Sequence, residues 1–305
     1  MGINNQTKMR FLIKTYGFIG DILFASSIAS KLKEQYGSDT LIDYCIGFPQ
    51  PYKLLKNNPD INEVYLSQNK GPRVTLPKEV DLSQYDIIYE LPECKQDIPP
   101  TIWYQSHCKI KTPTPEYKIY TDSILDSSVK YELSLINPDK VKVIGYVANW
   151  KQLTIKYSKE KYEIGMDNIP QIMSHTQTNT RDIDFILNEL QNQFILIPLG
   201  YDHNVTQYHT GLDSTSTYTN TTSIIKYCDL VIGQEGGMTN LAAGVGTRCI
   251  ITTDFMHVLY GPNGIMKKYS EVKLGPKNMF PNSNHIHIDP FASDEDIINI
   301  IKNEI

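Results

Sequence analysis

The sequence lacks several features that would place it at once in a broad class. Its 305 residues contain no apolar run that approaches the ~18 residues of a membrane span. Lys14, Gly17 and Asp21 interrupt the stretch where a signal peptide would have its apolar core. The net charge of −5 is opposite to the basic excess of nucleic-acid-binding domains. We therefore expect a cytoplasmic protein with no transmembrane segment and no nucleic-acid partner.

Disulfide and metal motifs are also missing. The five cysteines are odd in number and form no CxxC pair or Cys/His cluster, which favours free thiols in a reducing compartment. His285 and His287 alternate as on a strand, but no acidic or thiol partner lies at ligand spacing. We expect no metal site and no cofactor.

What the sequence does contain, twice, is an apolar strand that runs through glycines into a helix. The first case is Gly17-Phe-Ile-Gly-Asp21, and the second, late in the chain, is Gly233-Gln-Glu-Gly-Gly-Met-Thr-Asn240. Such a junction leaves unpaired backbone N–H groups at the edge of a sheet. Two of them predict an α/β protein of two Rossmann-like, doubly wound domains that face a central cleft holding the ligand.

The order of predicted elements supports this organisation, since strands alternate with helices as in parallel sheets. We predict strands at 11–15, 40–46, 63–66, 85–90, 140–148, 194–198, 229–232 and 248–252. We predict helices at 21–36, 51–56, 180–191, 222–227, 238–245 and 293–302, the last with a capping box of Ser293 and Asp296. The proline-rich segment 92–115 reads as a long irregular loop. The domain boundary is placed after residue 139, giving domains 1–139 and 140–305.

Asp21 is the candidate catalytic residue. A carboxylate at a loop–helix junction can accept a proton from an attacking hydroxyl. Gly17 and Gly20 would let a ligand approach the backbone closely. The alternative is an acid that only stabilises a helix N-terminus.

The second junction is a candidate diphosphate site. A helix that starts directly after Gly236 offers N–H donors and a partial positive charge to a pyrophosphate. Glu235 could accept hydrogen bonds from sugar hydroxyls, or it could simply cap the helix.

Four segments carry a family resemblance. They are residues 9–29, 54–64 with Leu54-Leu55 and 58–64 as the matching parts, 194–200 and 227–247, in the family's order and spacing. In them the chain resembles the heptosyltransferases of lipopolysaccharide core synthesis and their relatives, which are inverting, metal-independent glycosyltransferases of the two-Rossmann-domain type called GT-B. The resemblance implies that Asp21 is the general base. It also implies that Gly236, Gly237, Met238, Thr239 and Asn240 bind the donor diphosphate.

The chain departs from this family at the donor site. The family has Asp followed by Ser or Thr where this chain has Glu235-Gly236, and His where it has Asn240. These changes favour a donor other than ADP-heptose. The basic residue that neutralises the diphosphate has no exact counterpart, and Lys151 is the nearest candidate. The alternative for Lys151 is an ordinary exposed lysine.

These observations favour an inverting glycosyltransferase. The N-terminal domain would bind a glycan or lipid-linked glycan acceptor, and the C-terminal domain a nucleotide-sugar donor. Two alternatives stay open. One is a sugar-nucleotide epimerase of similar architecture, which is less favoured because no second acid is clearly paired with Asp21. The other is a sugar-nucleotide-binding protein that has lost turnover.

Overall fold

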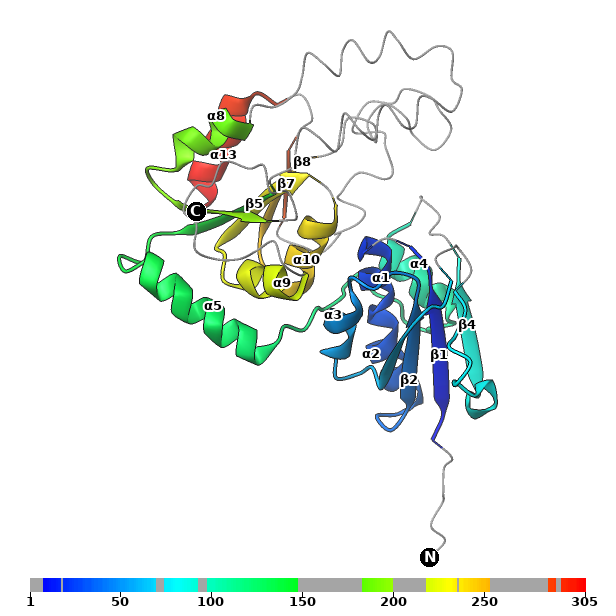
Figure 1. Cartoon of the computed structure of the whole chain (residues 1–305). Coiled ribbons are helices and arrows are strands. Elements are labelled where there is room, and N and C mark those ends of the chain that lie inside the picture. Colours follow the sequence, from blue (N-terminus) through cyan, green and yellow to red (C-terminus); the bar gives the residue numbers. More distant parts are fainter. Residues whose placement is uncertain are drawn as a thin grey trace, which may run out of the picture. The chain divides into compact units, whose positions relative to one another are not determined.

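A computed structural model describes residues 8–17, 19–69, 74–92, 98–147, 183–199, 218–234, 236–252, 285–288 and 292–305. The chain divides into two compact units, Met1–Thr121 and Asp122–Ile305. Each has its own parallel sheet (Figure 1).

The sheet of the first unit has the order β3-β2-β1-β4, which begins like the strand order of doubly wound nucleotide-binding folds. Its strands are β1 (Arg10–Thr15), β2 (Leu41–Ile46), β3 (Glu63–Leu66) and β4 (Ile87–Leu91). Its helices are α1 (Ile19–Ala25), α2 (Ser27–Tyr36), α3 (Tyr52–Lys56) and α4 (Pro100–His107), with a 3-10 turn at Leu82–Gln84.

Strand β1 lies inside this sheet, between β2 and β4 (Figure 1). Its side chains Phe11, Leu12 and Ile13 are fully buried. On one face the ring of Phe11 contacts Tyr36 of α2, with ring centroids 5.1 Å apart. On the other, Leu12 packs with Val74 and Tyr85. Because its carboxyl end leads directly into α1, this buried strand fixes the position of the first glycine junction.

The sheet of the second unit has the order β6-β5-β7-β8-β9, the flavodoxin-like order 2-1-3-4-5. Its strands are β5 (Val143–Val147), β6 (Ile195–Leu199), β7 (Leu230–Gln234), β8 (Cys249–Thr252) and β9 (Ile286–Ile288). Its helices are α5 (Ser123–Ile136), α8 (Ile183–Leu190), α9 (Tyr218–Lys226), α10 (Gly237–Val245) and α13 (Asp294–Glu304). The core joins Ile144, Ile232 and Ile250 of the sheet to Leu187 of α8 and Ile301 of α13.

Helix α5 belongs to the second unit. Asp122 caps its N-terminus by accepting hydrogen bonds from the amides of Ile124 and Leu125. On the same helix, Asp126 accepts a 2.5 Å hydrogen bond from Lys226 of α9. The boundary expected after residue 139 lies beyond this helix, whereas the compact units divide before it.

Two sequence predictions need correction. The segment expected to be an irregular loop contains α4, which begins at Pro100, because proline suits the first turn of a helix where its missing N–H is not needed. The single helix expected from residue 21 begins at Ile19 and divides at Ser26 into α1 and α2. There the hydroxyls of Ser26 and Ser27 donate to the carbonyls of Leu23 and Phe24, as side chains that compete with regular helix bonding do.

None of the helices in the described ranges has the length and apolar character needed to cross a bilayer.

Candidate functional site

Asp21 lies in the first turn of α1, directly after the tight turn at Gly17. Gly17 has a φ of 137°, a conformation that favours glycine. A β-carbon at position 17 would lie 2.6 Å from Cβ and 2.7 Å from Oδ2 of Asp21. The carboxylate therefore packs against the bare backbone of Gly17. Gly20, expected in the loop, lies within α1.

A second residue holds the Asp21 carboxylate. The hydroxyl of Tyr104, on α4, donates a hydrogen bond of 3.1 Å to Oδ1 of Asp21. Tyr104 is 1% exposed, whereas Asp21 is only half-buried, so the carboxylate is anchored from within the unit and still reaches its surface. Tyr104 was not predicted as a site residue, because its segment was assigned to a loop. Pro99-Pro100 followed by an apolar and aromatic run was the available signal for a helix.

The buried side-chain amide of Gln105 holds helix α4 in place. The Nε2 of Gln105 donates to Oγ of Ser27 on α2 at 2.8 Å, and its Oε1 accepts from the amide of Thr114 at 2.7 Å. Gln105 is fully buried, and its bond to Ser27 is shielded from water. The residue next to Tyr104 thus ties α4 to the helix that follows α1.

Aromatic side chains lie at the same carboxyl edge of the sheet. Tyr16 follows β1 and Phe48 follows β2, with ring centroids 5.9 Å apart. A β-carbon at Gly47 would come within 2.8 Å of the Tyr16 ring, so the glycine makes room for it. Both rings are only half-buried, which leaves apolar surface near the Asp21 junction.

The second junction runs from β7 through Gly236 into α10. The amide of Gly236 donates to Oγ1 of Thr239 at 3.0 Å, and that hydroxyl donates to the carbonyl of Gly236, also at 3.0 Å. The side chains of Thr239 and Asn240 are buried, while Gly237 and Met238 are half-buried. At this helix start the accessible surface therefore belongs to Gly236, Gly237 and Met238, and Thr239 stabilises the turn from inside.

Strand β7 approaches β5 closely just before this turn. A β-carbon at Gly233 would lie 2.3 Å from Cγ2 of Val147, so only glycine fits. Two residues predicted for this site, Lys151 and Glu235, lie outside the described residues.

The cysteines in the described ranges are buried and free. Burial raises the pKa of the Cys45 thiol to about 11 and that of Cys228 to about 12. Burial therefore disfavours the thiolate form of both cysteines, which is the form that acts as a nucleophile. The described residues also hold no cluster of three or more His, Cys, Asp or Glu side chains suited to a metal ion.

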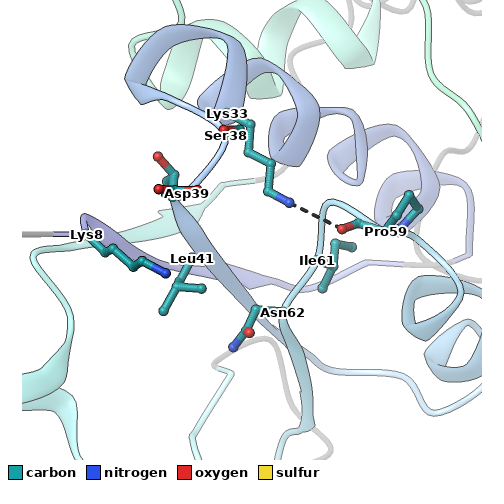
Figure 2. Close-up of a pocket in the computed structure, with 9 residues that line it drawn as sticks. Lys8, Lys33, Ser38, Asp39, Leu41, Pro59, Ile61 and Asn62 are labelled. Atoms are coloured by element: carbon teal, nitrogen blue, oxygen red, sulfur yellow. Dashed lines mark hydrogen bonds between the residues drawn. The ribbon is translucent and has the colours of Figure 1, made fainter.

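A pocket of about 360 Å³ opens at the amino ends of β1 and β2, the sheet edge opposite Asp21. Figure 2 shows Lys33 of α2 reaching toward the carbonyl of Pro59, to which it donates at 3.2 Å. Lys33 also pairs with Asp60, at 3.5 Å. Ligands of parallel α/β sheets bind at the carboxyl ends of the strands, so this pocket is separate from the candidate site.

Comparison of the sequence with protein-family models gave no match, and neither did comparison with curated proteins. Solved structures do resemble the chain. A glycosyltransferase family 9 protein from Veillonella parvula is 10% identical with a TM-score of 0.59, each chain being 97% covered. The ADP-heptose lipopolysaccharide heptosyltransferase II of Escherichia coli is 11% identical with a TM-score of 0.61, over 97% of this chain and 98% of that one.

The iron-containing dodecameric glycosyltransferase TibC of enterotoxigenic E. coli is 8% identical with a TM-score of 0.50, over 86% of this chain and 61% of that one. At such identities the likeness is one of fold. It confirms the α/β fold with two parallel sheets that the resemblance to heptosyltransferases implied. That the two domains face one cleft stays a prediction.

Proposed function

We propose that this protein is a glycosyltransferase that moves a sugar from a nucleotide-sugar donor to a hydroxyl of a glycan or lipid-linked glycan, with inversion at the anomeric carbon. The fold shared with glycosyltransferases supports the class of enzyme. The observation that carries the proposal is the Asp21 carboxylate, held between Gly17 and Tyr104 at the carboxyl edge of the first sheet.

In the proposed reaction, Asp21 accepts the proton of the acceptor hydroxyl as its oxygen attacks the anomeric carbon. The bond from that carbon to the diphosphate oxygen breaks, and its electron pair leaves with the nucleoside diphosphate. Attack from the face opposite the leaving group inverts the configuration. The half-buried rings of Tyr16 and Phe48 give the acceptor an apolar surface beside the base.

The start of α10 is the proposed diphosphate site. Backbone N–H groups of Gly237 and Met238 and the helix dipole would stabilise the charge that develops on the leaving group, while the N–H of Gly236 is bonded to Thr239. Because this stabilisation comes from the backbone, the proposal includes no metal and no cofactor. Glu235 is proposed to bind donor hydroxyls and Lys151 the diphosphate.

The test is a calorimetric titration of the full chain with ADP-, UDP-, GDP- and dTDP-sugars, followed by measurement of nucleoside diphosphate release and of the anomeric configuration of the product. We expect one donor to bind and to be turned over with inversion. The donor is expected to differ from ADP-heptose because of Gly236 and Asn240. Binding without release would favour the binding-protein alternative, release with retention would exclude the inverting mechanism, and no binding by any donor would overturn the proposal.

We also propose a cytoplasmic location. Four free, buried thiols in the described ranges are typical of a reducing compartment.

A further inference from the structure

The hydrogen bond between Tyr104 and Asp21 joins two helices that are far apart in sequence. Tyr104 lies on α4, is 1% exposed and donates to Oδ1 of Asp21 at 3.1 Å. Its neighbour Gln105 locks α4 onto Ser27 of α2, so the phenol ring is held by a helix that is itself fixed. The Tyr104 hydroxyl therefore has a fixed position beside Asp21.

The other side of the same carboxylate is also constrained. A β-carbon at Gly17 would lie 2.7 Å from Oδ2, so the glycine backbone forms the surface on which Oδ2 rests. With Oδ1 bonded to Tyr104 and Oδ2 against Gly17, the plane of the carboxylate is defined from both sides. An ionised carboxylate has about four lone-pair sites, so the bond from Tyr104 occupies only part of its capacity to accept hydrogen bonds.

We propose that Tyr104 is a positioning residue for Asp21, an inference that rests on the proposed function. Its hydroxyl fixes the rotation of the carboxylate and thereby directs Oδ2 to the acceptor hydroxyl. It also favours the ionised form of Asp21, because a hydrogen bond donated to a carboxylate stabilises its charge. Both effects act on proton removal from the acceptor and neither acts on donor binding.

Tyr44 provides a matched control. It is also fully buried in the first unit, and its hydroxyl donates at 2.9 Å to the carbonyl of Ala25, at the end of α1. Tyr44→Phe and Tyr104→Phe therefore each remove one buried hydroxyl bonded to α1, and only the second removes a bond to Asp21. A purely structural role for Tyr104 would make the two variants behave alike.

The experiment measures kcat, donor KM and the pH profile of kcat/KM for the wild type, Tyr104→Phe, Tyr44→Phe, Asp21→Asn and the double variant Tyr104→Phe/Asp21→Asn. For Tyr104→Phe we expect kcat to fall about 10-fold to 100-fold, as for other losses of orientation, with donor KM unchanged. The acid limb of its profile should move to higher pH. Tyr44→Phe should keep the wild-type profile, and Tyr104→Phe should cause no further loss in the Asp21→Asn background.

The outcomes separate the two proposals. Full activity of Asp21→Asn, or a wild type that transfers no sugar, would overturn the proposed mechanism and this inference with it. A loss in Asp21→Asn combined with a Tyr104→Phe variant that matches Tyr44→Phe in kcat and pH profile would overturn the inference alone. An additive loss in the double variant would also contradict it, because Tyr104 would then act independently of Asp21.

Discussion

Asp21 rests on the backbone of Gly17, so closely that a β-carbon at position 17 would lie 2.6 Å from Cβ of Asp21. An alanine at this position must displace the carboxylate, and it must also adopt a φ of 137° that non-glycine residues avoid. The position of the Asp21 side chain therefore requires glycine at position 17.

Replacing Gly17 with alanine tests this relationship. We expect turnover to fall about 100-fold, the effect of misplacing a reacting group by about 1 Å. Gly37→Ala is the control, since Gly37 has a φ of 106° but no heavy atom within 4 Å of the added β-carbon. Both variants should lose about 1–3 kcal/mol of unfolding free energy from backbone strain, measured by chemical denaturation. Only Gly17→Ala should lose activity, and equal turnover in the two variants would show that the contact is unimportant.

Replacing Asp21 with asparagine tests the general base. Turnover should fall roughly 10²–10⁴-fold, the usual contribution of a positioned proton acceptor, while donor affinity measured by calorimetry stays within about twofold. Asp294→Asn removes another first-turn acid, on α13, and should leave turnover unchanged. Asp294→Asn should lose only stability, because Asp294 lies at a helix N-terminus. If Asp21→Asn behaved in the same way, Asp21 would be a helix-terminal acid and no base.

Replacing Gly237 with valine tests the diphosphate site. A branched side chain at the first residue of α10 should obstruct the backbone N–H groups and weaken nucleoside diphosphate binding by about 10-fold or more. Gly246→Ala is the control at the other end of the same helix, where φ is 87° and the added carbon meets no atom within 4 Å. Calorimetric affinities that are equal for the two variants would place the diphosphate elsewhere.

Treatment with EDTA tests the proposed independence from metal. We expect turnover to be unchanged after dialysis against the chelator, because backbone donors and a helix dipole are proposed to stabilise the leaving group. Loss of activity that Mg²⁺, Mn²⁺ or Fe²⁺ restores would contradict this proposal.

The stability of the second unit should depend on pH through His285. Its Nδ1 accepts a 3.0 Å hydrogen bond from the amide of Cys249. Burial, together with the charge of Arg248, lowers the pKa of His285 to about 4. The unfolded chain takes up a proton on this ring below pH ~6.5, and the folded chain does not until about pH 4, so protons favour unfolding between these values.

The contribution of His285 is therefore complete above pH 6.5 and is lost as the pH falls toward 4. We expect the wild type to lose on the order of 2 kcal/mol more than His285→Gln over this range, after discounting for partial exposure of the ring. Glutamine keeps an acceptor but does not titrate. Denaturation at pH 7, 6, 5 and 4.5 measures the difference, and parallel curves for the two proteins would show that the histidine is not protonated on unfolding.

The sequence predicted those parts of the fold that depend on local patterns. The buried strands β1 and β7 and helix α10 occur where apolar runs and glycines placed them. The capping box at Ser293 is confirmed, since its hydroxyl accepts from the amide of Asp296 and the Asp296 carboxylate accepts from the amide of Ser293.

The contacts that hold Asp21 in place could not be predicted from local patterns. Tyr104 meets Asp21 only because α4 packs on α1 and α2, and no local pattern encodes a contact between segments so distant in sequence. Helix α4 was also not predicted, because the prolines around it indicated a loop. One of these prolines, Pro100, is in fact the first residue of the helix. The roles of Lys151 and Glu235 stay predictions, because both lie outside the described residues.

The attachment of α5 to α9 determines where the chain could be divided to exchange one compact unit for that of a structurally similar protein. A junction after residue 139 would transfer α5 with the first half and separate Asp126 from Lys226 of α9. A junction between Thr121 and Asp122 keeps the helix, its Asp122 cap and its ion pair in one piece. Chimeras joined between Thr121 and Asp122 should therefore fold more often than chimeras joined after residue 139.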